Sequence, residues 1–207
     1  MSSFQIVVAR YNEDIDWLTP IIDNCIIYNK GDPLFCKNEK KLDNVGRESH
    51  TYLHHIIENY DTLADIVIFT QANIADHVGR NDINYLFNMY KTTQEHNKSY
   101  PLVNYTWDGN DKGCWSPKWN LYSMHGYTNL RYKNNEEISF QDWFLKNIMN
   151  VYPNPMYIYS SAIFSVKKEL ILKHPKSYYE KLIKECDYWN SPIEAHFFER
   201  SWYYIFN

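Results

Sequence analysis

The sequence has few cysteines, and their spacing argues against a CxxC motif and against a zinc site. Its 207 residues include only Cys25, Cys36, Cys114 and Cys186. No two of them form a CxxC pair or follow the spacing of zinc ligands. We therefore expect free thiols in a reducing compartment.

Long apolar runs and basic stretches are also missing. The N-terminal residues MSSFQIVVARYNED contain no apolar core of a signal peptide, and no later run approaches the length that spans a membrane. The formal net charge is -4, and charges of both signs are mixed along the chain. Without a basic stripe, neither nucleic acid nor membrane lipid is expected as a partner. The sequence predicts a soluble, cytoplasmic protein.

Phosphate-binding loops, repeats and linkers are absent as well. Neither GxxxxGK[ST] nor GxGxxG occurs, which excludes the two commonest phosphate-loop motifs. Hydrophobic residues make up 44% of the chain and aromatic residues 17%, which favours a folded globule over disorder. We expect a single domain over residues 1–207 and leave open whether it is part of a longer chain.

The most informative stretch that is present is DIVIFTQANIADH, Asp65 to His77. Residues 66–69 form an unbroken apolar run that is typical of a strand buried on both faces. Polar side chains follow at once, where ligands bind in open α/β sheets, just past the carboxyl ends of the strands. An ordinary surface loop after a core strand would also be polar.

The first 70 residues alternate between strand and helix patterns. Expected strands cover 4–9, 25–28 and 66–69; expected helices cover 15–22, interrupted by Pro20, and 44–60; residues 34–43 are expected to be loop. This alternation predicts a parallel, doubly wound sheet.

The second half is less regular. Helical patterns occur at 83–90, 138–149 and 178–186, and a last helix is expected to start at Ser191, with Pro192 in its first position. Residues 156–166 predict a strand pair or one bent strand, followed by a helix from 167. Residues 100–135 are rich in Trp, Tyr, Asn and Gly and show little periodicity.

Polar residues follow each of the three expected strands. Arg10 and Tyr11 come after the first, Lys30 after the second and Gln71 after the third. At the start of the helix expected over 44–60, Gly46 leaves the backbone N–H groups accessible and Arg47 adds a cation, which together suit an anion. Cations, an aromatic ring and a carboxylate in one crevice suit a nucleoside diphosphate: the ring stacks on the base, the cations contact the diphosphate, and the carboxylate can bind a divalent metal. Taken singly, each could be an ordinary surface residue.

Several segments together resemble a known family: VVARYNEDIDWL, IIYNKGDP, NVGRESHTYLHHIIENYD, DIVIFTQANIADH, AIFSVKKELILKHPKSYYEKL and ERSWYYIF. They are similar, in order and over nearly the whole chain, to small glycosyltransferases of the GT-A type. This family includes a glycosyltransferase domain that large algal viruses encode to build their capsid glycan, and an uncharacterised fungal family.

The resemblance implies a Rossmann-like GT-A fold, an α/β protein whose central sheet is mixed but mostly parallel and flanked by helices. It further implies transfer of a hexose or deoxyhexose, such as glucose or rhamnose, from a UDP-sugar to a hydroxyl of an oligosaccharide or glycoprotein, in the host cytoplasm if the protein is viral. Residues 1–100 would bind the donor and residues 101–207 the acceptor. The implied donor-binding residues, with Tyr11 against the uracil, are Ala9, Arg10, Tyr11, Glu13, Asn29, Lys30, Gly46, Arg47, Gln71 and Asn73.

A metal site is the point at which the chain departs from this family. GT-A enzymes usually carry Asp-x-Asp after the third strand, whereas this chain has Gln71-Ala72-Asn73. Asp76 and His77 follow closely and are the expected ligands of Mn²⁺ or Mg²⁺. Alternatively, arginine and lysine neutralise the diphosphate themselves.

An acceptor hydroxyl needs a carboxylate base if the anomeric centre is inverted. The candidates are Asp142, Glu194 and Glu199, although Asp142 and Glu194 also occupy positions where a glutamate or aspartate simply caps a helix. The aromatic segment 105–122 suits sugar stacking or a core. A non-catalytic carbohydrate-binding module built from the second half is the alternative function.

Overall fold

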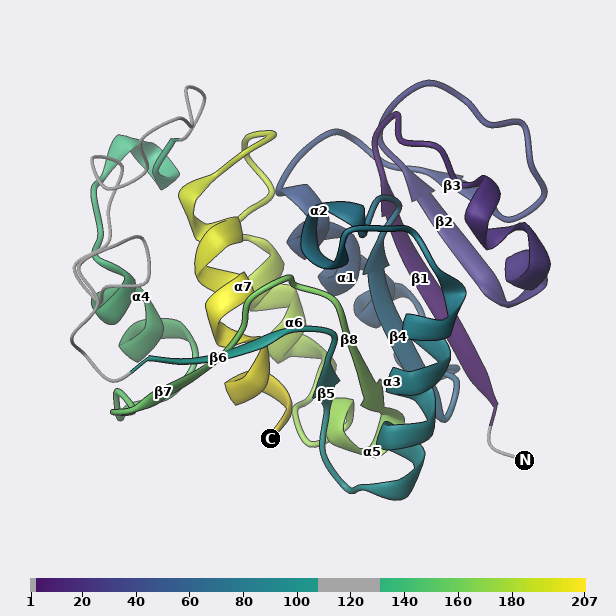
Figure 1. Cartoon of the computed structure of the whole chain (residues 1–207). Helices are drawn as coiled ribbons and strands as arrows, with labels where there is room; N and C mark the ends of the chain where they lie inside the picture. The colour runs from purple at the N-terminus through teal and green to yellow at the C-terminus, as the bar shows by residue number, and fades with distance from the viewer. Residues whose placement is uncertain (1–2, 108–130) are drawn as a thin grey trace.

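A six-stranded sheet runs through the centre of the molecule (Figure 1). The computed structural model describes residues 3–107 and 131–207. The strand order is β3-β2-β1-β4-β8-β5, in which β1 to β4 are parallel and β8 runs antiparallel to both of its neighbours. The strands are β1 (Phe4–Arg10), β2 (Cys25–Asn29), β3 (Glu39–Lys41), β4 (Ile66–Gln71), β5 (Tyr100–Pro101) and β8 (Phe164–Lys167).

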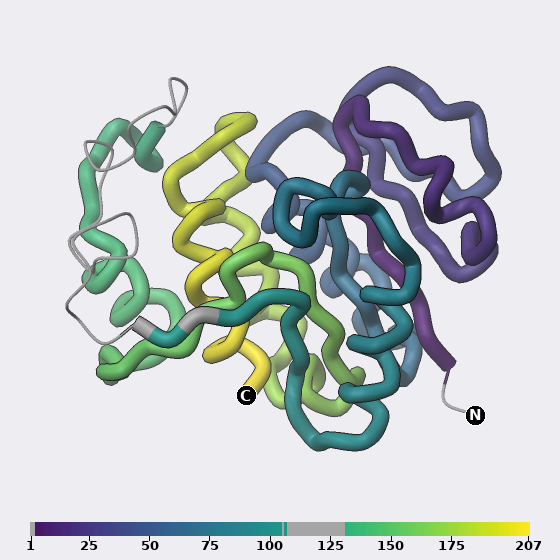
Figure 2. The backbone as a smooth tube through the Cα atoms, viewed as in Figure 1, coloured from purple at the N-terminus to yellow at the C-terminus, as the bar shows by residue number. Residues whose placement is uncertain are grey.

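Helices cover both faces of this sheet, as the tube in Figure 2 also shows. Together with the sheet they confirm the predicted α/β architecture, a mixed and mostly parallel sheet flanked by helices. The helices are η1 (Asp16–Asn24), α1 (Arg47–Glu58), α2 (Ala75–Val78), α3 (Ile83–Glu95), η3 (Lys133–Asn135), α4 (Phe140–Asn147), α5 (Lys168–Ile171), α6 (Lys176–Ile183) and α7 (Ile193–Phe206). Within the described ranges, no helix is both long and apolar enough to span a membrane.

The apolar strands divide their side chains between two cores. On β1, Val7 faces the core formed with α1 and α7, whereas Ile6 and Val8 face the core formed with η1 and α3. On β4, Phe69 and Ile68 divide in the same way. A strand buried on both faces needs apolar residues at successive positions, which is why the unbroken runs predicted these two strands.

Two segments depart from the sequence-based prediction. Residues 34–43, expected to be loop, contain β3, a three-residue edge strand whose sequence is Glu-Lys-Lys. Short, charged edge strands resist pairing with other chains, but they give no apolar signal. The segment expected as a helix over 15–22 is a 3-10 helix, η1, in which Ile21 leaves helical geometry directly after Pro20.

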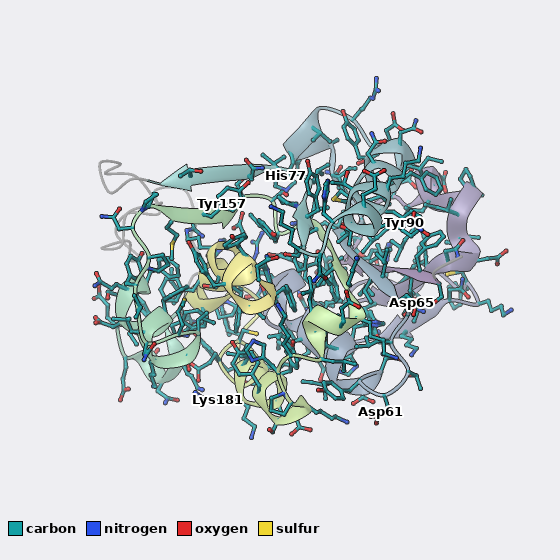
Figure 3. The ribbon with its side chains drawn as sticks, turned by 90° about the horizontal axis from the view of Figure 1, so that it is seen from below. Asp61, Asp65, His77, Tyr90, Tyr157 and Lys181 are labelled. Atoms are coloured by element: carbon teal, nitrogen blue, oxygen red, sulfur yellow. The ribbon has the colours of Figure 1, made fainter. Side chains whose placement is uncertain are left out.

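Residues 156–166 form a strand pair whose members belong to different sheets. β7 (Met156–Tyr159) pairs with β6 (Asn104–Trp107) in a separate two-stranded sheet, and β8 inserts beside β4. Figure 3 shows α7 between β7, which carries Tyr157, and α6, which carries Lys181. The last helix begins one residue later than predicted, because Pro192 rather than Ser191 is its N-cap.

The order of the strands reverses between β1 and β4. β2 and β3 are added on one side of β1, and β4 then returns to its other side. The connection through η1 lies on one face of the sheet, and the connection through α1 lies on the opposite face. The connections that leave the carboxyl ends of β1 and β4 therefore lead to opposite sides of the sheet, toward β2 and toward β5, and such a switch point is where open α/β sheets bind ligands.

Candidate functional site

A cleft of about 360 Å³ lies at this switch point. It is built from the ends of β1, β2 and β4, the start of α1 and the loop before α7. Seven of the ten residues predicted to bind the donor line it. The lining consists of Ala9, Arg10, Tyr11, Glu13, Lys30, Asn44, Arg47, Glu48, Gln71, Asn190 and Ser191.

Arg10 joins the two loops that form one wall of the cleft. Its side chain is only 9% exposed. Nε donates to the Glu13 carbonyl oxygen at 2.8 Å, and Nη1 donates to Asn29 Oδ1 at 2.8 Å and to the Asp32 carbonyl oxygen at 3.0 Å. A buried guanidinium used in this way fixes the loops after β1 and β2 relative to each other. Asn29, predicted to contact the donor, lies beneath the wall as the partner of Arg10.

Lys30 is a cation at the base of the cleft. Its ammonium donates to the backbone carbonyl oxygens of Val45, at 2.5 Å, and of Arg47. Burial lowers the pKa of Lys30 to about 8. An ammonium has three N–H groups, and within the described chain only two are used, so the third remains for a ligand.

The turn before α1 brings Arg47 to the cleft. Gly46 and Arg47 both have positive φ, 62° and 49°. The Gly46 amide donates to the Trp189 carbonyl oxygen at 2.7 Å, and the Arg47 amide donates to that of Asn190 at 3.3 Å. The turn is thereby held against the loop before α7. The Arg47 side chain is 37% exposed, and its Nε lies 3.5 Å from Glu48 Oε2.

Gly46 is required by close packing as well as by its conformation. A Cβ at this position would lie 2.5 Å from the Cys186 carbonyl oxygen and 2.6 Å from His50 Cβ. We expect Gly46→Ala to lower the free energy of unfolding by about 2–4 kcal/mol in urea titration, because strain and overlap add.

Gly79 provides the matched control for that substitution. Its φ is +81°, but a Cβ there would meet no atom within 4 Å. Gly79→Ala should therefore cost only the strain of a left-handed residue, about 1–2 kcal/mol. Equal losses in the two variants would contradict the close contact at Gly46.

Tyr11, Glu13 and Gln71 complete the predicted lining. The Tyr11 ring is half exposed, and its backbone amide donates to Glu13 Oε2 at 2.7 Å. Gln71 Nε2 donates to the Ser161 carbonyl oxygen at 3.2 Å, which leaves its carbonyl oxygen for other partners. An exposed aromatic ring therefore stands at the rim of a cleft whose base is cationic.

The three residues predicted after Gln71 do not line the cleft. Asn73 Oδ1 accepts from the Ala75 amide at 3.1 Å at the start of α2. Asp76 and His77 are exposed neighbours on this short helix, and His77 is labelled in Figure 3. Partial desolvation lowers the pKa of His77 and Arg47 lowers it further, whereas the carboxylates of Asp76 and Glu48 oppose the shift. Among the described residues, no three His, Cys, Asp or Glu side chains gather as a metal-ligand set.

The carboxylates predicted as bases lie outside the cleft lining. Asp142 is exposed and caps its own helix with the N-cap Ser139, whose Oγ donates to Asp142 Oδ2 at 2.6 Å and accepts from the Asp142 amide at 3.1 Å. Glu194 is 1% exposed and accepts from the Tyr188 hydroxyl at 2.5 Å and the Lys133 amide at 3.1 Å. Burial raises the pKa of Glu194.

A second hollow, of about 310 Å³, lies beside Glu194, on the side of α4. Glu199 lies further along α7. Burial raises its pKa to about 7, and Glu48 adds to the rise, whereas Arg200 and Arg47 oppose it. Glu48 and Arg47, which influence the pKa of Glu199, both line the cleft.

Four lining residues were not predicted. Asn44 and Glu48 adjoin Gly46 and Arg47, so the same helix-start signal could have included them. Asn190 and Ser191 come from the distant loop before α7, which carries no local ligand-binding signal. Of the aromatic segment 105–122, residues 108–122 lie outside the described residues, so its stacking role stays a prediction.

Comparisons with known proteins give one match. A family model with the description "Protein of unknown function (DUF3431)" matches residues 6–207. No curated protein and no solved structure matches the chain.

Proposed function

Because the chain belongs to the DUF3431 family, whose description assigns no activity, we propose a function from the site itself: a glycosyltransferase that moves a sugar from a UDP-sugar to a glycan hydroxyl. The observation that carries this proposal is the cleft at the switch point, with Lys30 and Arg47 at its base and Tyr11 at its rim. Nucleotides bind at this position in open α/β sheets. The choice of a sugar nucleotide with uridine as the donor rests on the resemblance to GT-A glycosyltransferases.

The roles of the lining residues follow from their chemistry. Lys30 and Arg47 meet the diphosphate, whose negative charge grows as the bond to the anomeric carbon breaks. Tyr11 stacks on the base, and the amides of Gln71, Asn44 and Asn190 suit sugar hydroxyls. The attacking hydroxyl passes its proton to a carboxylate, for which Asp142, Glu194 and Glu199 remain the proposed candidates.

A divalent metal, Mn²⁺ or Mg²⁺, fits this site only with oxygen ligands from the donor. Asp76 and His77 are two adjacent, exposed ligands, and a diphosphate supplies the remaining oxygens in many such sites. When bound, the metal would neutralise charge on the leaving diphosphate. Glu48, which lines the cleft whereas Asp76 and His77 do not, would supply a further carboxylate ligand there.

A thermal-shift screen tests the proposal, because a ligand that binds the native state raises its melting temperature. UDP, with and without Mn²⁺, should raise it, whereas free hexoses alone should not. A shift by free sugars without any shift by UDP would favour a carbohydrate-binding module instead. Sugar transfer to a glycan acceptor would then establish the reaction.

Arg47→Ala should leave the fold intact and weaken UDP binding by about 1.5–3 kcal/mol, or roughly 10- to 150-fold in calorimetry, because a charge-assisted contact to the diphosphate is lost. The control is Arg80→Ala, since Arg80 is 72% exposed and pairs with Asp82 away from the cleft. Unchanged UDP affinity in Arg47→Ala would remove this residue from the site.

A further inference from the structure

Glu13 lines the cleft with a carboxylate of which only one oxygen is in use. Its Oε2 accepts from the Tyr11 amide at 2.7 Å. Its Oε1 has no hydrogen-bond partner among residues 3–107 and 131–207. The side chain is exposed to solvent, so a ligand in the cleft can reach it.

The position of this carboxylate is set before any ligand binds. The main-chain carbonyl oxygen of Glu13 accepts from Arg10 Nε at 2.8 Å, and the Tyr11 amide holds the other end of the residue. Arg10 is only 9% exposed and also donates to Asn29 Oδ1 at 2.8 Å, which ties this loop to the end of β2. A group fixed in this way costs little conformational entropy when a ligand uses it.

One peptide unit, between Arg10 and Tyr11, joins Glu13 to the cationic base of the cleft. Its N–H donates to Glu13 Oε2, and its carbonyl oxygen accepts from the Lys30 amide at 2.9 Å. The Glu13 carboxylate and the Lys30 backbone therefore lie on opposite sides of the same peptide group. The ring that belongs to this peptide group, that of Tyr11, is half exposed at the rim.

The covalent order of a nucleoside diphosphate then places its ribose near Glu13. On the proposed function, the base stacks on the Tyr11 ring at the rim and the diphosphate meets Lys30 at the base of the cleft. The ribose joins these two groups, so it passes the Tyr11 backbone, where the carboxylate is held.

The chemistry of a carboxylate agrees with this placement. An ionised carboxylate only accepts hydrogen bonds and repels a diphosphate, whereas the ribose hydroxyls are neutral donors. The N–H of uracil is a donor too, but it lies at the edge of the base that is remote from the ribose. An acidic side chain that accepts from a ribose hydroxyl is a known device at the switch points of nucleotide-binding sheets.

We propose that Glu13 is a specificity-determining residue, whose Oε1 accepts from a ribose hydroxyl of the donor and so selects ribonucleotides over deoxyribonucleotides. This proposal rests on the proposed function, because it takes the ligand to be a nucleoside diphosphate. It adds the sugar of the nucleotide to the features that the cleft recognises.

The experiment compares the affinities of the protein for UDP, 2′-deoxy-UDP and 3′-deoxy-UDP by calorimetry. The measured quantity is the ratio of the affinity for UDP to that for each analogue, because the charges of the ligands are the same and cancel. We expect the analogue that lacks the recognised hydroxyl to bind about 10- to 100-fold more weakly than UDP, the size of one hydrogen bond to a charged group.

Two variants separate this role from support of Tyr11. The single carbonyl oxygen of Glu13→Gln can still accept from the Tyr11 amide, but no charged acceptor is left for the ribose, so the ratio should fall at least about 5-fold. Glu13→Ala removes both bonds, so all three affinities should fall and the ratio should approach one.

Asp14→Asn is the matched control, since it removes the same charge one residue further along the chain. Asp14 is exposed and accepts from the Asp16 amide at 2.8 Å, and it lies outside the cleft lining. This variant should keep the wild-type ratio.

Three results would overturn the role of Glu13. The first is equal affinity of the wild type for UDP and both analogues. The second is a preference for UDP that persists in Glu13→Gln, and the third is a Glu13→Ala variant that loses affinity for all three ligands with its ratio unchanged. Each would leave UDP binding, and with it the proposed function, in place, whereas absence of UDP binding to the wild type would overturn both.

Discussion

Replacing Trp202 by alanine is expected to lower the free energy of unfolding by about 3–5 kcal/mol, the largest loss predicted for this chain. Trp202 is fully buried in α7 and packs against the rings of Tyr52, Phe164 and Phe206, with centroid separations of 6.0, 5.4 and 5.9 Å. It therefore joins α7 to α1 and to β8, and its loss leaves a cavity among three elements. Urea unfolding followed by far-ultraviolet circular dichroism, which reports on the backbone and not on tryptophan fluorescence, measures the loss.

Trp202→Phe is the control for this prediction. It keeps an aromatic ring in the core and removes the indole N–H, which is buried without a hydrogen-bond partner among the described residues. Removing an unsatisfied polar group partly offsets the lost volume, so we expect a cost of about 1–2 kcal/mol. A loss below 2 kcal/mol for Trp202→Ala would mean that the core collapses around the gap.

The strands that carry the cleft could be predicted because their signal is local. β1 and β4 are buried on both faces and appear as apolar runs, and the polar residues after them follow from strand ends alone. β3 could not be predicted, because an edge strand of charged residues is held by its neighbour's backbone and not by an apolar pattern.

The roles of individual site residues were harder to predict, since they depend on distant partners. Arg10 lines the cleft as predicted, but the sequence does not show that its Nη1 also donates to Asn29 at the end of β2 and to the Asp32 carbonyl oxygen beyond it. Glu194 resembles a simple helix-start glutamate, yet it is buried against Tyr188 and Lys133. The wall formed by Asn190 and Ser191 is separated from the rest of the cleft by more than a hundred residues. Sequence spacing holds no information on such pairings.

The second prediction of large effect is that Glu199→Gln stabilises the protein at alkaline pH. The pKa of this carboxyl is about 7 in the folded protein and about 4.3 in an unfolded chain. The penalty of ionising it in the fold is therefore absent below pH 4, grows between about pH 4.5 and 7, and is complete above that range. A shift of this size corresponds to about 2–4 kcal/mol.

Urea unfolding at pH 5 and pH 8 measures this stabilisation. Glu199→Gln should gain about 2–4 kcal/mol over the wild type at pH 8 but less than about 1 kcal/mol at pH 5. Glu95→Gln, whose carboxylate is exposed, should change little at either pH. Equal stabilities of the wild type and Glu199→Gln at pH 8 would mean that Glu199 ionises without cost in the fold.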